Sequence, residues 1–324
     1  MAAYRLAITL SFAGALLAAI NQCAAQEFPS RAIRFVVPYG ASGGPDVLAR
    51  VIGRKLAENI GQPVVVDNRP GAGGIIGTDI VAKAAPDGYT VLVGDTGPLG
   101  INPTLYQKLP YDAIKDFAPV TLAVSTPVYL VGHAGMPFQS VRQLIDYARS
   151  HPGMPYGSTG VGSVHHLGMQ LFASMAGVNM NHIPYKGVAQ SIPAVISGDI
   201  AVVIAALPSV MPHVGTGKVR LLAVAGAKRT SNMPEVPTVA EGGLPGYDIK
   251  IDVGFLVPAG TPRAIVDKLN SEIIKVLNTP EVAQQLGKIG IDPVGSSPEQ
   301  YAETIRADIQ KFGKLIKDSG ARAD

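Results

Sequence analysis

The chain has 324 residues, with 27 lysines and arginines against 24 aspartates and glutamates, and therefore a formal net charge of +3. Neither this small excess nor the scattered distribution of the charges indicates binding to nucleic acid. The single cysteine excludes a disulfide framework, but a chain of this length can bury enough core to be stable without one.

The first 25 residues resemble a secretion signal. Arg5 precedes a near-continuous apolar run from Leu6 to Ile20, and Cys23-Ala24-Ala25 offers the small residues that a signal peptidase reads. We therefore expect cleavage after Ala25 and a periplasmic mature protein with a net charge of +2 and no cysteine. An uncleaved anchor is a weaker alternative, because the run is shorter than the roughly 20 residues of a membrane span. A lipoprotein acylated at Cys23 is a third reading, which Gln22 disfavours because a small residue is needed there.

Strand and helix patterns alternate along the rest of the chain, which predicts an α/β fold with helices on the faces of its sheets. The expected strands are Arg34–Val37, Pro63–Asp67, Thr90–Val93, Val120–Val131, Ile200–Ile204, Lys218–Val224 and Gly254–Val257. The expected helices are Asp46–Asn59, Ile75–Ala84, Val141–Ser150, His165–Met175, Pro262–Leu277, Pro280–Ile289 and Pro298–Asp318.

The length predicts two lobes, because single α/β domains usually stay below about 250 residues. Two long β-rich segments, Val120–His133 and Leu221–Lys228, are the expected crossings between them. We therefore expect a discontinuous lobe 1 made of residues 26–123 and 227–324, with lobe 2 inserted as residues 124–226.

Two glycine-rich turns each lead into a predicted helix: Tyr39-Gly40-Ala41-Ser42-Gly43-Gly44-Pro45-Asp46 and Gly157-Ser158-Thr159-Gly160-Val161-Gly162-Ser163. Glycine lets the backbone approach a ligand, and the unpaired N–H groups that open a helix bind anions. The pair predicts one carboxylate ligand between two lobes, although each turn could instead be only a tight connection and Ser163 only a helix cap. The candidate contacts are Tyr39, Gly40, Ala41, Ser42, Gly43 and Gly44 in the first turn, and Thr159, Gly160, Gly162 and Ser163 in the second.

A series of short motifs, in order along nearly the whole mature chain, resembles the tripartite tricarboxylate transporter substrate-binding receptors of the Bug or TctC type. They are the segments 37–50 and 68–74, Ala85-Pro86-Asp87-Gly88-Tyr89-Thr90, Ile101-Asn102-Pro103-Thr104-Leu105-Tyr106, the segment 160–167, His182-Ile183-Pro184-Tyr185-Lys186-Gly187, the segment 235–241 and Pro258-Ala259-Gly260-Thr261-Pro262.

This resemblance implies a two-lobed periplasmic-binding-protein fold of the type II kind, each lobe a mixed sheet flanked by helices, with two crossing segments. It also implies capture of a small carboxylate (an amino acid, a di- or tricarboxylate, or an aromatic acid) and its delivery to a membrane permease. We expect a monomer without a cofactor. The alternative is a ligand-sensing protein that presents its closed form to a sensor kinase.

Four further residues are candidate contacts. In the family, the turn Asp95-Thr96 borders the cleft, and Asp95 departs from the small or hydroxylated residue expected there. If it faces the cleft, Asp95 can receive a ligand amino group; a helix cap is the alternative. Tyr185 and Lys186 open another helix, and Lys186 can pair with a distal carboxylate, remain solvated or bridge the lobes.

The sequence disfavours an enzyme. Ser163, His165 and His166 crowd together, but adjacent helical histidines diverge by about 100° and no acidic residue at helical spacing orients either one. No His-x-x-x-His spacing of a zinc site is found in the sequence either. We therefore expect neither catalytic residues nor a metal.

Overall fold

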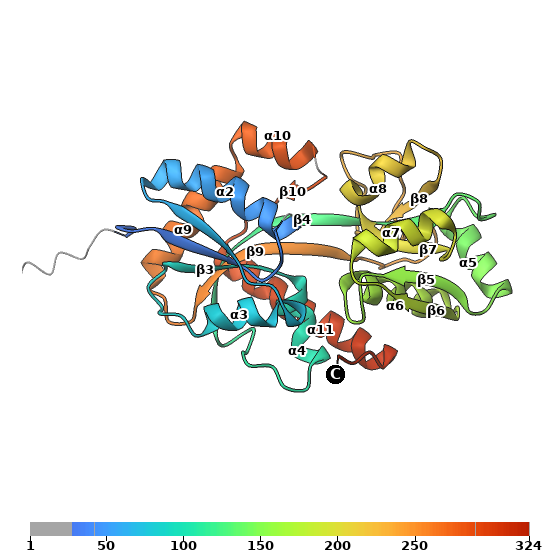
Figure 1. Ribbon diagram of the computed structural model, residues 1–324, viewed down its shortest axis with the longest axis horizontal. Helices are drawn as coiled ribbons and strands as arrows, with labels where there is room; N and C mark the ends of the chain where they lie inside the picture. The colour runs from blue at the N-terminus through green and yellow to red at the C-terminus, as the bar shows by residue number, and fades with distance from the viewer. Residues whose placement is uncertain (1–27, 42, 289, 324) are drawn as a thin grey trace, which may run out of the picture.

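The computed structural model describes residues 28–41, 43–288 and 290–323. They form two lobes side by side, joined by long strands that run through both (Figure 1). Ten of their strands belong to one continuous sheet, whose main order is β2-β1-β3-β9-β4-β7-β5-β6. The expected signal segment 1–25 and Ser42 lie outside the described residues.

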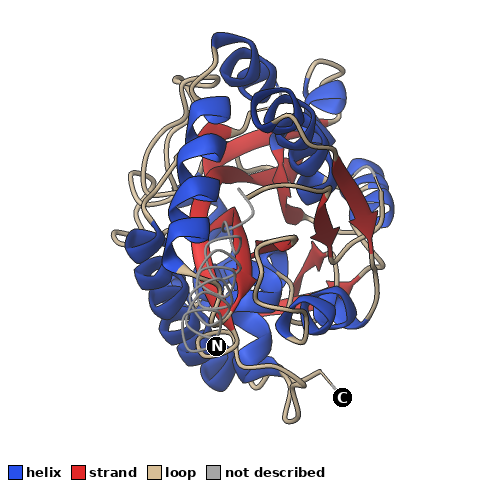
Figure 2. Cartoon of the chain, turned by 90° about the vertical axis from the view of Figure 1, so that its left-hand side faces the viewer, coloured by secondary structure: helices blue, strands red, loops and turns tan. Residues whose placement is uncertain are grey.

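Lobe 1 contains the first half of this sheet, in which β1, β2 and β3 are parallel and β9 is antiparallel to β3 and β4. Helices lie on both sides of these strands (Figure 2). Its strands are β1 (Ile33–Val37), β2 (Val64–Asn68), β3 (Thr90–Asp95), β9 (Lys250–Pro258), the start of β4 (Phe117–His133) and β10 (Asp292–Pro293). Its helices are α2 (Gly44–Ile60), η1 (Ala72–Gly74), α3 (Ile75–Ala82), η2 (Gly97–Ile101), α4 (Asn102–Leu105), α9 (Arg263–Leu277), α10 (Pro280–Lys288) and α11 (Pro298–Ser319).

Lobe 2 contains the second half of the sheet, in which β5 pairs in parallel with both β6 and β7, and β7 and β8 are antiparallel to β4. Its strands are the end of β4, β5 (Met154–Ser158), β6 (Met180–Pro184), β7 (Val202–Ala206) and β8 (Val219–Val224). Its helices are α5 (Val141–Ser150), α6 (Val164–Ala176), α7 (Val188–Ser197) and α8 (Leu207–Val214).

The lobes are joined by β4 and β9. The two strands pair from Phe117 opposite Pro258 to Pro127 opposite Lys250, and β4 then continues into lobe 2 beside β7 and β8. The first crossing is therefore the expected one. The second falls on β9 and not on Leu221–Lys228, because that segment is β8 and its following turn, which pair inside lobe 2. The chain up to Ile249 packs into the lobe-2 core, so this lobe extends past residue 226.

The hydrophobic cores follow the same division, with one exception. Buried side chains of α2, α9 and the first strands fill lobe 1, where the rings of Phe35 and Phe255 pack at a tilt of 50°, with 5.1 Å between their centroids. Phe312 and Ile316 of α11, with Leu105 of α4, pack instead into the core cluster of lobe 2. The lobes therefore contact each other beside the crossing strands as well as through them. The expected two-lobed, mixed α/β architecture is confirmed.

Candidate ligand-binding site between the lobes

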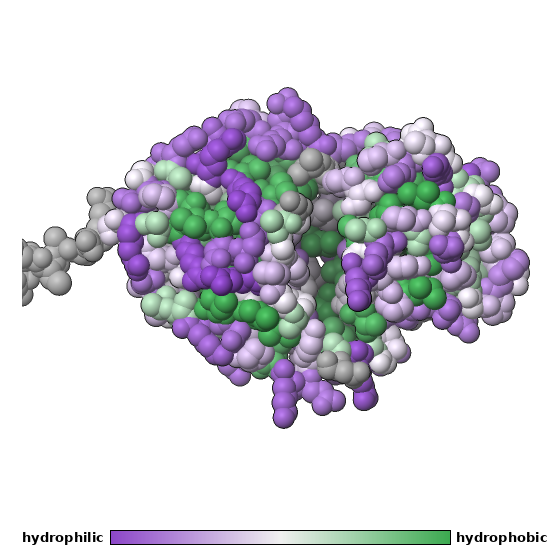
Figure 3. Space-filling model, viewed as in Figure 1, coloured by the Kyte–Doolittle hydropathy of each residue, from purple (hydrophilic) through white to green (hydrophobic). Residues whose placement is uncertain are grey.

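A cleft of about 880 Å³ lies between the lobes and is lined from both sides. Figure 3 shows a furrow at this position, with hydrophobic residues in its depth. Ile101 and Leu105 of lobe 1 face Val161 and Val188 of lobe 2 as part of its apolar lining. A ligand in this cleft would lose water from its hydrocarbon part while its polar ends meet the backbone described below.

The lobe-1 wall begins where β1 ends and α2 starts. Gly43 is the N-cap of α2 in extended conformation, without a side-chain cap, and Pro45 follows in the first turn. Proline has no N–H to offer, and it suits the start of a helix. The Asp46 carboxylate is bound by Arg50, 2.9 Å from Oδ1, and by the Asn68 amide at 2.9 Å. Its charge is therefore neutralised by a partner, which leaves the positive end of α2 available to an anion.

Asp95 lies on the same wall and is tied to Tyr39. The Tyr39 hydroxyl donates to Asp95 Oδ1 at 2.8 Å, and the N–H of Gly97 donates to the same oxygen at 2.9 Å. Burial raises the pKa of the Asp95 carboxyl to about 6, although both hydrogen bonds lower it. Asp95 lines the cleft and closes the turn that leads into η2, although the N-cap of η2 is Thr96 and no described side chain caps that helix.

The lobe-2 wall is the second glycine-rich turn and the start of α6. Ser163 is the N-cap, and its hydroxyl oxygen accepts from the N–H of His166. Thr159 Oγ1 lies 2.8 Å from His165 Nδ1, and burial lowers the pKa of His165 to about 4, so this imidazole is neutral at neutral pH. Among the described residues, no group accepts from the N–H groups of Val164 and His165, the first two of the helix.

A third helix N-terminus borders the cleft from lobe 2. Gly187 is the N-cap of α7 with φ +97°, and no side chain caps it. Lys186, Val188 and Ala189 line the cleft beside it. Lys186 is exposed and has no carboxylate partner in the described part of the chain. The ends of α2, α6 and α7 thus converge on one cleft, each with the partial positive charge of a helix N-terminus.

The predicted contacts separate into two groups. Thr96 is buried, and its Oγ1 accepts from the N–H of Asp252 at 3.0 Å. Tyr185 packs against the lobe-2 cluster around Tyr129. The carbonyl of Gly160 accepts from the Ser163 hydroxyl. These three residues and Gly44 do not line the cleft, and Ser42 lies outside the described residues. The residues that do line it are Tyr39, Gly40, Ala41, Gly43, Asp95, Thr159, Gly162, Ser163 and Lys186.

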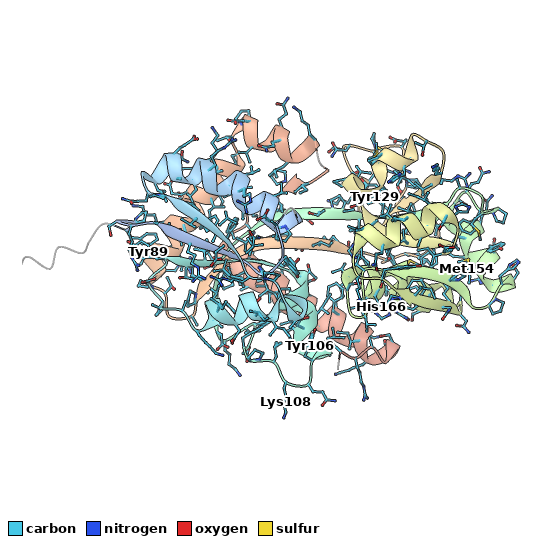
Figure 4. The ribbon with its side chains drawn as sticks, viewed as in Figure 1. Tyr89, Tyr106, Lys108, Tyr129, Met154 and His166 are labelled. Carbon is cyan, nitrogen blue, oxygen red and sulfur yellow. The ribbon has the colours of Figure 1, made fainter. Side chains whose placement is uncertain are left out.

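Sequence reasoning missed one whole segment of the cleft wall. This is the turn of η2 and α4, where the Asn102 amide donates to the carbonyl of Gly73 at 3.0 Å. Figure 4 shows Tyr106 at the end of this segment, on the lobe-1 side. In the sequence, the motif 101–106 carries only the family resemblance, and His165 is a candidate only for catalysis. The cleft residues not predicted are Pro45, Gly73, Gly97, Ile101, Asn102, Leu105, Tyr106, Val161, Val164, His165, Gly187, Val188, Ala189 and Ile251.

No group of three or more histidines, cysteines, aspartates or glutamates is arranged to hold a metal ion within residues 28–41, 43–288 and 290–323. In the same part of the chain, no helix combines the length and the apolar character needed to cross a bilayer.

Comparison with known proteins identifies the family. Residues 48–321 match the family described as the tripartite tricarboxylate transporter family receptor. A Pseudomonas sp. (strain P51) protein in the tcbD-tcbE intergenic region is 41% identical over 291 residues, which cover 89% of this chain and 86% of that one.

Two solved structures resemble this one over their whole length. An R. palustris protein solved with adipate is 36% identical with a TM-score of 0.82, covering 91% of this chain and 99% of that one. MatC from Rhodopseudomonas palustris, with bound malate, is 31% identical with a TM-score of 0.77, covering 89% and 100%. The family expected from the sequence is therefore confirmed, and this chain belongs to the tripartite tricarboxylate transporter family receptors.

Proposed function

We propose that this chain is a periplasmic receptor that captures a small organic carboxylate between its lobes and delivers it to a tripartite tricarboxylate-type permease. The observation that carries the proposal is the convergence of three helix N-termini on one cleft. Such ends bind anions through backbone N–H groups. Similar proteins solved with adipate and malate support a ligand with carboxylate ends.

One carboxylate would bind at the lobe-2 wall. The N–H groups of Val164 and His165 at α6 and of Val188 at α7 are available donors, and the Thr159 hydroxyl stands beside them. Lys186 supplies the positive side chain at this wall. Charge-assisted hydrogen bonds of this kind contribute about 1.5–3 kcal/mol each. This set favours an anion over a neutral ligand without requiring an arginine.

The lobe-1 wall would set the selectivity for the other end of the ligand. The Tyr39 hydroxyl and the Gly97 N–H both donate to Oδ1 of Asp95, so within the described residues Oδ2 remains to accept from a ligand. A second ligand carboxylate beside Asp95 would be repelled, whereas an ammonium group would be attracted. We therefore propose that Asp95 favours carboxylates with an amino group.

A calorimetric titration of the full chain with adipate, malate, glutamate, aspartate, citrate and benzoate tests this function. At a hundredfold excess over the dissociation constant, a bound ligand stabilises the native state by about 2.7 kcal/mol, so a thermal-shift measurement serves as the parallel readout. Binding of one carboxylate class without its chemical conversion supports a receptor. Absence of binding by every acid, also after the protein has been unfolded and refolded to release a carried-over ligand, contradicts the proposal.

A further inference from the structure

A pair of stacked imidazoles lies behind the lobe-2 wall. The rings of His166 on α6 and His182 on β6 are 3.9 Å apart between centroids and inclined by 18°. The ring of Tyr156 on β5 lies 5.1 Å from that of His182, inclined by 20°. His166 is only 4% exposed, and neither histidine lines the cleft. Figure 4 places His166 in lobe 2, within the layer of β5, β6 and α6. The two rings therefore cannot touch a ligand directly.

His166 holds one glycine of the wall. The N–H of Gly162 donates to His166 Nδ1 at 3.1 Å, closing a loop over the first turn of α6. Since Nδ1 accepts this bond, it carries no proton, and the neutral ring must carry its proton on Nε2. Burial and the neighbouring His182 both lower the pKa of His166, to about 4. The neutral form that the bond requires is thus the form that the surroundings favour.

His182 holds the other glycine through a serine. Its Nε2 lies 2.7 Å from Ser158 Oγ, and Ser158 is fully buried. The same hydroxyl oxygen accepts from the N–H of Gly160 at 3.1 Å. Ser163 then closes the turn, because its hydroxyl donates to the carbonyl of Gly160 at 2.8 Å. Both positions favour glycine, because their backbone angles φ are positive, +129° at Gly160 and +75° at Gly162.

These bonds determine which N–H groups remain for a ligand. Gly160 and Gly162 use their N–H groups inside the wall, contrary to the expectation that both expose their backbone to the ligand. The available donors are instead at the start of α6, at Val164 and His165, whose direction depends on the fixed turn before them. A turn released from its two imidazoles would lose this direction, because the glycines have the widest choice of conformations.

We propose that His166 and His182 are positioning residues of the ligand-binding wall: the stacked pair fixes Gly162 and, through Ser158, Gly160, and thereby aims the first N–H groups of α6 into the cleft. The inference rests on the proposed function for the identity of the ligand. The positioning itself is a property of the chain without a ligand and can be tested separately.

The first test uses the full chain without ligand. Long-range proton–nitrogen spectra of ¹⁵N-labelled protein should show His166 with an unprotonated Nδ1 and a protonated Nε2. Amide exchange of Gly162 should be slow in wild type and in His166→Asn, whose Oδ1 can accept in place of Nδ1, and at least tenfold faster in His166→Phe, which keeps an aromatic ring but no acceptor. A protonated Nδ1 in wild type would overturn the proposal even if the phenylalanine variant does not fold.

The second test measures, by calorimetry on the same three proteins, the affinity for the acid of the panel that wild type binds most tightly, which we expect to be glutamate. His166→Phe should bind this acid about tenfold more weakly than wild type, because the net contribution of one hydrogen bond, about 1.4 kcal/mol, corresponds to a factor of about ten; His166→Asn should bind it within about threefold of wild type. Equal affinity of wild type and a folded His166→Phe would refute the positioning role. If wild type binds no acid of the panel, the proposed function fails, while the exchange of Gly162 still decides the role of His166.

Discussion

Replacing Gly162 by alanine tests the contact that joins the lobes beside the cleft. Gly162 has φ +75°, where an L-residue costs about 1–2 kcal/mol. A Cβ added there would lie 2.2 Å from Leu105 Cδ2 and 3.0 Å from Cδ1. Leu105 is 6% exposed and packs in the lobe-2 core cluster, so it can yield only by leaving its rotamer, at about 0.5–1.5 kcal/mol. We expect a total loss of about 1.5–3.5 kcal/mol in the free energy of unfolding.

Thermal unfolding of the ligand-free chain measures this loss. For a protein of this size, each kcal/mol lowers Tm by about 2 °C, which gives a drop of about 3–7 °C. The matched control is Gly177→Ala, at the other end of α6. Gly177 has φ +62°, and a Cβ there would meet no heavy atom within 4 Å, so it carries only the backbone cost. If Gly162→Ala is no more destabilising than Gly177→Ala, the contact with Leu105 does not exist in solution.

A double-mutant cycle with Leu105→Ala separates the two parts of the cost. Leu105→Ala alone should cost about 2–5 kcal/mol, as for other buried leucines. In the Gly162→Ala background, Leu105→Ala also removes the clashing methyl groups. The double mutant should therefore lose less free energy of unfolding than the sum of the losses of the two single mutants. Strict additivity would show that the alanine methyl group is accommodated without displacing Leu105.

Four further changes test other parts of the site. Gly43→Val should abolish glutamate binding yet leave Tm within about 2 °C, because its Cβ would only touch the Gly40 carbonyl, at 3.6 Å. Unchanged affinity would show that this turn is not part of the site. Lys186→Gln should weaken carboxylate binding about fivefold, with exposed Lys218→Gln as the unaffected control. Asp95→Asn should weaken glutamate binding but not adipate binding, which paired titrations can contradict by showing equal losses. The pKa of His166 is lowered to about 4 in the fold, so between pH 6.5 and 4 the unfolded chain gains a proton that the native chain does not. Wild type should therefore lose its Tm advantage over His166→Phe as pH falls through this window, and a constant difference would refute the shift.

Local patterns sufficed for most elements of the fold. The longest helix of the described residues, α11, agrees with its predicted bounds to within one residue, because Ser297 and Gln300 form a capping box ahead of an amphipathic run. The sequence did not indicate α8, whose Pro208 and Pro212 disfavour a helix although the first stands in its initial turn. It did not indicate β6 either, since Met180–Pro184 lacks a continuous apolar run and forms a strand only by pairing with β5.

The site was predictable where one turn carries it and not where distant segments meet. The glycine-rich turns can be recognised in the sequence by their composition, and most of their residues line the cleft. The bond between Tyr39 and Asp95 joins residues 56 apart, and that between Ser158 and His182 joins residues 24 apart. The bond from the Gly162 N–H to His166 Nδ1 spans only four residues, but the composition of this turn does not indicate that a histidine side chain is the acceptor.

The structure also joins the cleft to the strands that cross between the lobes. Thr96, next to Asp95, accepts through Oγ1 from the N–H of Asp252 on β9, and Asp252 Oδ1 accepts from Ser125 of β4 at 2.7 Å. Asp252 is 3% exposed, and Lys250 Nζ lies 3.1 Å from its other oxygen. Any rotation of one lobe against the other must bend β4 and β9, which are shared by both halves of the sheet. Thr96 does not line the cleft but is bonded to β9, and we infer that it lies at the hinge, one residue from the Asp95 carboxylate that we propose to contact the ligand.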